Sequence, residues 1–330
     1  MGMGFLLQVK HLTTSFHTDC GVTRAVDDVS FSVDDGEVIG IVGESGCGKS
    51  VTALSIMGLV PRPAGEIEDG AILFQGQDLL ALNEREMRQI RGGKIAMVFQ
   101  DPMTSLNPVY TIGSQLAEAV RLHQGRSRRE AVRIAAQALS KVHIPDPERR
   151  LREHPHELSG GMRQRVMIAM ALCCEPDLII ADEPTTALDV TIQAQIMDLM
   201  GKLQAEQGMS IIMISHNLGV IAEMTNRVLV MYAGQIVEEN SVQGLFEAPL
   251  HPYTRGLIAC SVGREAQDER RRLHAIPGRA PNLVELGHAC RFETRCQDRF
   301  NRCGVEVPDL IEVGEGRRVR CFKYSKQEEK

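Results

Sequence analysis

The sequence predicts an α/β fold in which a parallel sheet is covered by helices on both faces. Continuous apolar runs of strand length recur along the chain, at residues 37–42 (EVIGIV), 177–182 (DLIIAD), 210–215 (SIIMIS) and 228–234 (VLVMYAG). Segments with helical apolar spacing separate them, and this alternation is typical of a parallel sheet with buried strands. Residues 5–42 instead alternate apolar and polar side chains, which predicts a small sheet ahead of the core.

The other elements follow from the same patterns. Further strands are expected at residues 71–76 (AILFQG) and 94–100 (KIAMVFQ), and helices within 113–142, from Ser159 onward, and from Val190 to Gly208. Beyond about residue 250 the buried-strand runs stop, Arg and Pro increase and cysteines recur. We therefore predict a first domain of residues 1–250 and a small, cysteine-bearing C-terminal domain of residues 251–330.

A chain of 330 residues, with 43% apolar and 24% charged residues, is expected to form about two globular domains. Its formal net charge of −6 argues against a broad basic surface for nucleic acid. No apolar stretch reaches the roughly 18 residues of a membrane-spanning helix, and the start of the chain shows no secretory signal. Nine cysteines in such a chain favour a reducing cytosol over a disulfide scaffold.

Residues 43–50 read GESGCGKS and lie between a predicted strand and a predicted helix. This is the G-x-x-x-x-G-K-[ST] pattern in the structural context that it requires. Gly46 and Gly48 would let the backbone wrap closely, so that its N–H groups point into one concavity at the positive end of the new helix. Lys49 would reach the outer phosphates of a nucleotide, and Ser50 would hold Mg²⁺.

Polar side chains follow several other predicted strands. Asp182 ends an apolar run and could bind Mg²⁺, and Glu183 comes next, where it could accept a proton from an attacking water. Gln100 and His216 also follow apolar strands, although a single histidine there is more often structural than catalytic. Because ligands bind beyond the carboxyl ends of parallel strands, we expect these residues at one site.

A second anion site is expected at Ser159, Gly160 and Gly161, which begin a predicted helix. Serine is a good N-cap, and the glycines leave the N–H groups of the first turn open. Taken alone, an ordinary capped helix would explain the pattern equally well. This helix start cannot share the phosphate that the first loop already holds.

These segments, in this order, resemble the ATP-binding subunit of an ABC transporter over roughly residues 5–250. The Walker A loop is GESGCGKS, the Q-loop residue is Gln100, the signature is LSGGMRQR, Walker B is LIIADE, the D-loop is ALD and the switch histidine is His216. The resemblance implies a P-loop NTPase cassette with a RecA-like parallel core, an N-terminal antiparallel β subdomain and a helical subdomain at about residues 101–160.

The resemblance also implies the residues that act on ATP and Mg²⁺. Phe16 would stack on adenine, and the nucleotide-binding residues would be Phe16, Gly43, Ser45, Gly46, Cys47, Gly48, Lys49, Ser50 and Val51. Those acting in catalysis would be Lys49, Gln100, Glu183 and His216. Mg²⁺ would be held by Ser50, Gln100 and Asp182. Two cassettes would pair head to tail, with Asp189 at their interface and Ser159, Gly160 and Gly161 of one cassette closing over the ATP of the other.

A narrower resemblance links the chain to importers of dipeptides and oligopeptides. It rests on FQDPMTSLNPVYTIG, CEPDLIIADEPTTALDVTIQAQI and HPYTRGL, and it extends to the C-terminal region. It implies two integral membrane permeases, an extracytoplasmic solute-binding protein, a second ATPase subunit, paralogous or identical, and a peripheral position on the cytoplasmic face of a bacterial-type membrane. Residues 100–108 would form part of the groove for the permease. Importers of nickel or glutathione, and ABC ATPases that act on nucleic acid or ribosomes, are the alternatives.

Four cysteines of the C-terminal region, Cys290, Cys296, Cys303 and Cys321, are too close in sequence for chance packing. Four thiolates suit zinc or an iron–sulfur cluster, and the spacing lacks the paired knuckles of zinc sites. The resemblance to the peptide-importer branch implies a [4Fe–4S] cluster at such cysteines. We therefore expect a structural [4Fe–4S] cluster, with Zn²⁺ and free thiols as alternatives.

Cys47 lies inside the phosphate loop. The start of the following helix is expected to favour its thiolate and to make it reactive toward thiol reagents. An unreactive, packed thiol is the alternative.

Overall fold

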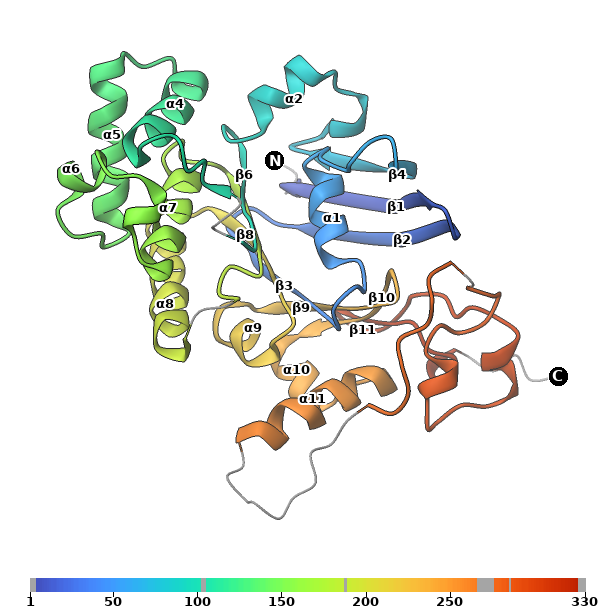
Figure 1. Ribbon diagram of the computed structural model, residues 1–330. Helices are drawn as coiled ribbons and strands as arrows, with labels where there is room; N and C mark the ends of the chain where they lie inside the picture. The colour runs from blue at the N-terminus through green and yellow to red at the C-terminus, as the bar shows by residue number, and fades with distance from the viewer. Residues whose placement is uncertain (1–3, 102–104, 187–188, 266–275, 285, 326–330) are drawn as a thin grey trace. The chain divides into compact units, whose positions relative to one another are not determined.

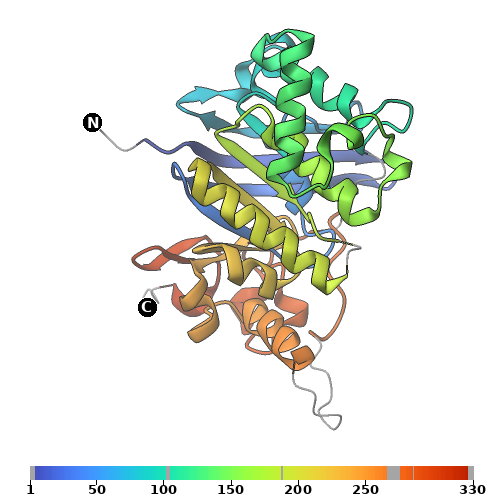
Figure 2. The same cartoon turned by 90° about the vertical axis from the view of Figure 1, so that its left-hand side faces the viewer.

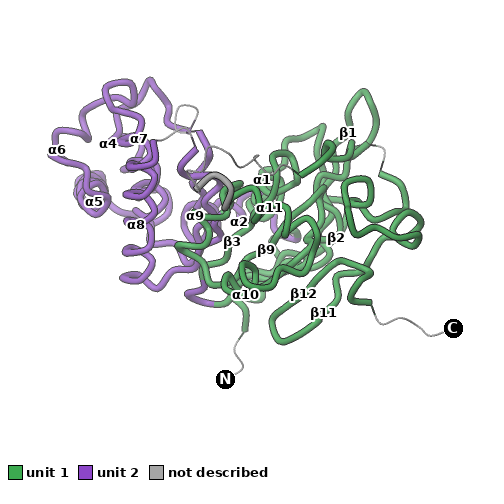
Figure 3. The backbone as a smooth tube through the Cα atoms, turned by 90° about the horizontal axis from the view of Figure 1, so that it is seen from below, with its two compact units in different colours: residues 1–34, 38–80, 214–330 green, residues 35–37, 81–213 purple. Residues whose placement is uncertain are grey.

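The computed structural model describes residues 4–101, 105–186, 189–265, 276–284 and 286–325. The chain forms two compact units, shown in different colours in Figure 3. Unit 1 consists of residues 1–34, 38–80 and 214–330, and unit 2 consists of residues 35–37 and 81–213.

Unit 1 begins with a four-stranded antiparallel sheet, drawn in blue in Figure 1. Its strands are β1 (Leu7–Thr18), β2 (Gly21–Val33), β4 (Gly65–Phe74) and β5 (Gln77–Asp78), in the order β2-β1-β4-β5. Leu7 lies opposite Val33 on one side and Phe74 on the other, and all three side chains are buried. The predicted alternation of apolar and polar residues is therefore confirmed as one buried face and one exposed face.

A second set of strands in unit 1 carries the phosphate loop. They are β3 (Val38–Val42), β9 (Arg227–Tyr232), β10 (Gln235–Ser241), β11 (Ile311–Gly314) and β12 (Arg317–Val319), neighbours in the order β11-β12-β10-β9-β3. Strands β3 and β9 are parallel, with Ile39 opposite Arg227, and the other pairs are antiparallel. The sequence did not predict β11 and β12, because both are short and mostly half-exposed.

Four α-helices and several 3-10 turns complete unit 1 as the structure describes it. The helices are α1 (Lys49–Ile56), α9 (Leu218–Met224), α10 (Val242–Glu247) and α11 (Pro252–Glu265). The 3-10 turns are η3 (Glu293–Arg295), η4 (Asn301–Gly304) and η5 (Phe322–Tyr324), and η1 (Leu79–Ala81) ends the segment after β5.

An aromatic cluster binds the C-terminal region to the end of β9 within unit 1. The ring of Tyr232 lies 4.5 Å from that of Tyr253 and 5.2 Å from that of Phe292, measured between centroids. His251 packs on Phe292 at 5.7 Å and is buried. Such pairs contribute about 0.5–1.5 kcal/mol each beyond the area they bury.

Unit 2 holds three more strands, which are buried along most of their length. They are β6 (Ile95–Val98), β7 (Leu178–Asp182) and β8 (Ser210–Ser215), in the order β8-β7-β6, and residues 214 and 215 of β8 already belong to unit 1. Strands β6 and β7 are parallel, with Ile95 opposite Leu178. The apolar runs at 177–182 and 210–215 are therefore confirmed as buried strands.

The four longer helices of unit 2 lie where the sequence predicts them, whereas the short helices at 84–90 and 147–150 were not predicted. The helices of this unit are α2 (Glu84–Ile90), α4 (Ile112–Gln124), α5 (Arg128–Lys141), α6 (Pro147–Arg150), α7 (Gly160–Leu172) and α8 (Val190–Gln207), with the 3-10 turn η2 (Pro155–Glu157). Helices α4, α5 and α7 pack side by side (Figure 1). Ser127 and Glu130 form a capping box at the start of α5, and Gly208 ends α8 in the left-handed conformation. The long α8 is clearest in Figure 2.

Among the residues described, no helix combines the length and the apolar character that crossing a bilayer would require.

Burial of His251 predicts a pH-dependent stability. Burial lowers the pKa of His251 from 6.5 to about 3, and its Nδ1 accepts a 3.0 Å hydrogen bond from the N–H of Tyr253, so the folded state holds a neutral ring. Because the unfolded chain binds a proton below pH 6.5, stability falls as the pH drops from 6.5 toward 3, by about 1 kcal/mol in the first pH unit.

Urea unfolding at pH 7.5, 6.5 and 5.5 tests this expectation. His251→Asn keeps an acceptor near Nδ1 but cannot be protonated, so its stability should change less with pH than that of the wild type. An equal pH dependence in both proteins would contradict the assignment.

Candidate nucleotide site

The phosphate loop connects the end of β3 to the start of α1. Gly46 and Gly48 have φ angles of +77° and +106°, in the left-handed region that favours glycine. A Cβ atom on Gly48 would lie 2.3 Å from the backbone oxygen of Ala25, whereas one on Gly46 would meet no atom within 4 Å. The loop therefore needs glycine at position 48 for two reasons, backbone conformation and space.

Lys49 bridges its own loop. Its Nζ donates hydrogen bonds to the backbone oxygens of Gly43 at 2.9 Å and Glu44 at 3.0 Å, and the residue is only 4% exposed. Within the described part of the chain, no side chain caps the first turn of α1, and that turn contains no acidic residue. A buried cation beside uncapped helical N–H groups fits an anion such as the phosphates of ATP.

The structure also places the other predicted nucleotide residues of unit 1. Ser45 and Gly46 are exposed at the tip of the loop, and Ser50 and Val51 are half-buried in the first turn of α1. Phe16 is half-buried on β1, and its ring covers Gly65 so closely that a Cβ there would lie 2.8 Å from Cε1. His216 follows the last residue of β8 and is exposed.

The expected thiolate at Cys47 is wrong for this loop. Cys47 is 4% exposed, and burial raises the pKa of its thiol although the nearby Lys49 ammonium opposes the shift. The desolvation of a charged sulfur outweighs the positive end of the helix. The structure therefore favours the packed, protonated thiol.

Unit 2 brings Gln100 and Glu183 together after two parallel strands. The amide Nε2 of Gln100 donates a 3.1 Å hydrogen bond to Oε2 of Glu183, and the hydroxyl of Thr186 donates to the same oxygen at 2.9 Å. Asp182 is the buried last residue of β7. Glu183 itself has a φ of +47°, an uncommon backbone conformation for a residue with a side chain, and such outliers cluster at functional sites. At these strand ends the carboxylate of Glu183 is thus held by two hydrogen-bond donors, Gln100 and Thr186. Thr186 was not predicted, because nothing in the sequence distinguishes it.

The start of α7 has the predicted cap. The Oγ of Ser159 accepts a 3.4 Å hydrogen bond from the N–H of Met162, and Ser159 and Gly160 are exposed. A Cβ on Gly160 would meet nothing within 4 Å. This helix start is open to a ligand from outside unit 2.

Asp189 caps the next helix. Its side chain accepts a 2.9 Å hydrogen bond from the N–H of Ile192 at the start of α8. The other residues of the predicted D-loop, Ala187 and Leu188, lie outside the described residues, as do residues 102–104 of the predicted permease groove.

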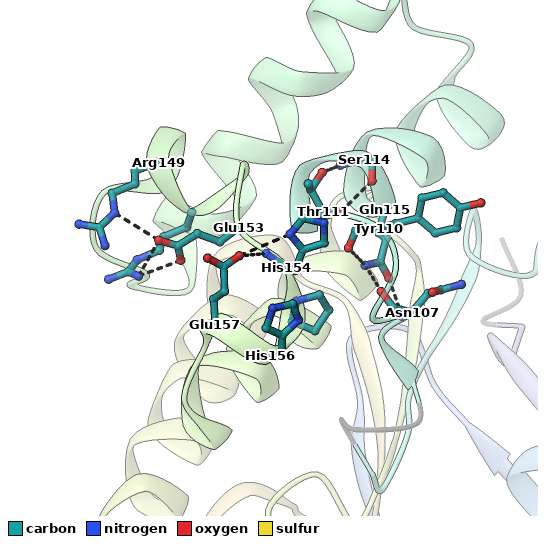
Figure 4. Close-up of polar contacts among 12 residues, drawn as sticks. Asn107, Tyr110, Thr111, Ser114, Gln115, Arg149, Glu153, His154, His156 and Glu157 are labelled. Carbon is teal, nitrogen blue, oxygen red and sulfur yellow. Dashed lines mark hydrogen bonds and ion pairs between the residues drawn. The ribbon is translucent and has the colours of Figure 1, made fainter.

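An exposed turn of unit 2 precedes α4 (Figure 4). The amide of Gln115 donates to the backbone oxygens of Asn107 and Tyr110, both at 3.0 Å. These bonds hold the turn so that Val109 is 75% exposed and Tyr110 is 58% exposed. Figure 4 also shows His154, whose backbone N–H donates a 2.6 Å hydrogen bond to Glu157.

The predicted metal site in the C-terminal region is wrong. Four cysteines, Cys290, Cys296, Cys303 and Cys321, do line one cavity, together with Phe292, Phe300 and Phe322. That cavity is only about 10 Å³, no more than a single water needs, so a four-iron cluster does not fit. Among the described residues, no group of three or more His, Cys, Asp or Glu side chains could hold a metal ion, whether iron or zinc.

The thiols of this cavity fit the packed alternative. Burial raises the pKa of Cys290 to about 11, and it also raises those of Cys296 and Cys321, so these thiols stay protonated. Aromatic packing and ion pairs hold this small region, so it does not need the metal that the prediction assumed.

Sequence analysis also missed a contact between the phosphate loop and the C-terminal region, both within unit 1. The guanidinium of Arg295 binds the carboxylate of Glu44, and the hydroxyl of Tyr253 accepts a hydrogen bond from the N–H of Glu44. Tyr253 belongs to the quoted HPYTRGL segment, but nothing in the sequence indicates that the segment touches the loop.

Three features described above are typical of an ATP-binding cassette. They are a phosphate loop that follows the buried strand β3, a helix that begins with glycines and is capped by Ser159, and a carboxylate that follows the buried strand β7. Family profiles agree: the profile for the ABC transporter family matches residues 26–186, and that for the oligopeptide/dipeptide transporter C-terminal region matches residues 237–303.

Curated relatives match almost the whole chain. A probable peptide ABC transporter ATP-binding protein of Sinorhizobium fredii is 53% identical over 96% of this chain and 95% of its own length. The dipeptide transport ATP-binding protein DppD of Escherichia coli is 48% identical over 96% of each chain, and the oligopeptide transport ATP-binding protein AppD of Bacillus subtilis is 47% identical over 98% of each. The chain belongs to the ABC transporter family of ATP-binding proteins, and it is an ATPase of the branch that carries the oligopeptide/dipeptide C-terminal region.

Solved structures agree with this fold. A dimeric ATP-binding cassette in a post-hydrolysis state, bound to ADP and phosphate, has a TM-score of 0.64 and 28% identity, and covers 72% of this chain and 98% of that chain. A subunit of the cbiONQ ABC transporter complex from Clostridium perfringens has a TM-score of 0.62 and 26% identity, over 79% and 94% of the two chains. The predicted cassette fold is confirmed.

Alanine substitutions at Gly46 and Gly48 should separate the cost of a left-handed backbone from the cost of a Cβ that clashes with its neighbours. Gly46→Ala meets only the left-handed backbone cost of about 1–2 kcal/mol, so it should weaken MgATP binding modestly. Gly48→Ala must also displace the backbone at Ala25, so it should abolish binding. Calorimetric titration with MgATP measures both, and equal effects of the two variants would contradict the loop geometry.

Cys47 should react slowly with thiol reagents. A protein treated briefly with N-ethylmaleimide at pH 7.5 should be labelled first at Cys20, which is exposed, and much later at Cys47. Mass spectrometry of the digested peptides locates the label. Labelling of Cys47 as fast as Cys20 would restore the thiolate that the sequence suggested.

Proposed function

We propose that this chain is the ATP-hydrolysing subunit of an importer that takes up dipeptides or oligopeptides. The observation that carries the proposal is the joint presence of an intact phosphate loop and the oligopeptide/dipeptide C-terminal region on one chain. Relatives that match nearly full length are named for peptide, dipeptide or oligopeptide transport. These names favour the peptide importer over the nickel, glutathione and nucleic-acid alternatives.

In the proposed cycle, ATP joins two cassettes head to tail. The phosphate loop of one cassette and the exposed start of α7 of the other bind the same ATP, through Lys49 on one side and Ser159, Gly160 and Gly161 on the other. The γ-phosphate supplies the charge that both surfaces attract, so its hydrolysis releases the pair. Asp189 is assigned to the interface of the two cassettes.

The chemistry in this proposal is positioning and charge stabilisation. In unit 1, Phe16 would stack on adenine, Gly43 and residues 45–51 would surround the phosphates, and Ser50 would hold Mg²⁺, which would supply positive charge for the reaction. In unit 2, Asp182 and Gln100 are the Mg²⁺ residues and Glu183 is the general base for the attacking water. His216 orients the γ-phosphate. The hydrogen bonds from Gln100 and Thr186 to Glu183 support that role because they fix the carboxylate in place.

The proposed partners are two integral membrane permeases, a second ATPase subunit and, through the permeases, an extracytoplasmic solute-binding protein. The exposed Val109 and Tyr110 beside residues 100–108 offer an apolar surface for a permease segment. Such an assembly places the chain on the cytoplasmic face of the membrane. We also propose residues 1–250 as the nucleotide-binding domain, with a helical subdomain at about 101–160, and residues 251–330 as the C-terminal extension.

Reconstitution tests the transport proposal. The chain should co-purify with integral membrane permeases, and in proteoliposomes its ATPase rate should rise with the solute-binding protein and dipeptides or oligopeptides. Stimulation by nickel or glutathione alone, with no response to a peptide panel, would overturn the peptide assignment.

Glu183→Gln should keep ATP binding and nearly stop turnover. Loss of the general base removes about 10²–10⁴-fold of the rate, while the amide preserves the shape of the side chain. The assembled complex should then accumulate in the ATP-bound, paired state, which size-exclusion chromatography detects.

Glu206→Gln provides the matched control, since this carboxylate is exposed in the last turn of α8. Near-normal hydrolysis by the Glu183 variant would exclude Glu183 as the base.

A further inference from the structure

Glu44 is the second residue of the phosphate loop, and the C-terminal region holds its side chain. Arg295 donates from Nη1 to Oε2 of Glu44 at 2.8 Å and from Nη2 to Oε1 at 3.0 Å. This two-point geometry matches the planar guanidinium to the planar carboxylate, and it is among the strongest side-chain contacts in proteins. The pair joins positions 251 residues apart in the chain, and both lie in unit 1.

Arg295 is fixed by other contacts as well. Its side chain is 4% exposed, and it also donates to the backbone oxygen of Pro277 at 2.9 Å and to the hydroxyl of Tyr232 at 3.2 Å. The guanidinium carbon lies 5.7 Å from the centre of the Tyr232 ring. A cation held in this way has little freedom, so Glu44 is bound to a rigid support rather than to a mobile surface arginine.

Tyr253 holds the backbone of the same residue. The N–H of Glu44 donates a 2.9 Å hydrogen bond to the hydroxyl of Tyr253, whose ring is fully buried in the aromatic cluster. The backbone oxygen of Glu44 accepts the 3.0 Å bond from Lys49. The C-terminal region thus contacts the carboxylate and the N–H of Glu44, and the phosphate-binding lysine contacts its carbonyl.

We propose that Arg295 and Tyr253 are positioning residues for ATP: by holding Glu44, they set the shape of the phosphate loop and thereby the affinity of the cassette for nucleotide. The inference rests on the proposed ATP-binding function and adds to it a task for the C-terminal region. Glycines make the loop intrinsically flexible, and ordering it at the moment of binding would cost affinity. A loop already held at Glu44 binds without that cost.

Binding of MgATP to the full-length chain, measured by equilibrium dialysis with labelled ATP, tests the proposal. Arg295→Met removes the charge and keeps most of the length of the side chain, and Glu44→Gln removes the other partner. Each should raise the dissociation constant about tenfold or more. The double variant should be little worse than either single variant, because both remove the same contact. Arg295→Lys, which keeps the charge but not the two-point geometry, should recover part of the affinity.

Arg318→Met is the matched control. Arg318 lies in the same C-terminal region and unit, and its guanidinium binds Glu239 of β10 and the backbone oxygen of Ser30 instead of Glu44. It should lower the thermal stability as Arg295→Met does and leave the dissociation constant for ATP unchanged. In the assembled complex, Arg295→Met should raise KM for ATP and leave kcat close to that of the wild type, because it does not touch the reacting atoms.

If Arg295→Met does not fold, Tyr253→Phe can be used in its place. This variant removes only the hydroxyl that binds the N–H of Glu44 and keeps the packed ring. It too should weaken ATP binding. Wild-type affinity in a folded Tyr253→Phe and in a folded Glu44→Gln would overturn the inference. Failure of the proposed function looks different: the wild type would then not bind ATP, and Lys49→Ala would change nothing.

Discussion

Lys49 reaches back across its own loop to the carbonyl groups of Gly43 and Glu44, and the local structure around the nucleotide site depends on this contact. The lysine can meet a phosphate only if the loop keeps its curved shape, and that shape requires left-handed backbone at Gly46 and Gly48. The loop begins on a completely buried strand, β3, and Glu44 is held from the C-terminal region. A flexible glycine segment thus becomes a fixed anion site because rigid elements restrain it on several sides.

Much of this arrangement could be predicted from the sequence because it depends on local chemistry. The strand that precedes Gly43, the cap at Ser159 and the helix stop at Gly208 each follow from a few neighbouring residues. The carboxylates after β7 were found because buried apolar runs and the polar residues that end them are visible in a single chain. The roles of these residues in binding and hydrolysing ATP stay predictions.

The parts that the sequence could not reveal depend on contacts between distant segments. Nothing near Arg295 indicates that its partner is Glu44, and β11 and β12 are too short and too exposed to be recognised by their pattern. The cysteines were misjudged for a related reason. Their spacing suggested a shared ligand, whereas the small cavity that they line is also lined by three phenylalanine side chains, which spacing does not record. Likewise, burial decides the protonation of Cys47, and burial is a property of the fold.

The separation of 251 positions between Glu44 and Arg295 also orders events during synthesis. A ribosome adds about 5–20 residues per second, so the phosphate loop leaves it roughly 10–50 seconds before Arg295 is made. Until Tyr253 is made, the nascent chain carries a complete Walker A motif whose glutamate lacks both of its C-terminal partners, and until Arg295 is made its carboxylate still lacks the guanidinium. The nucleotide site is thus among the first parts of the protein to be translated and among the last to be finished.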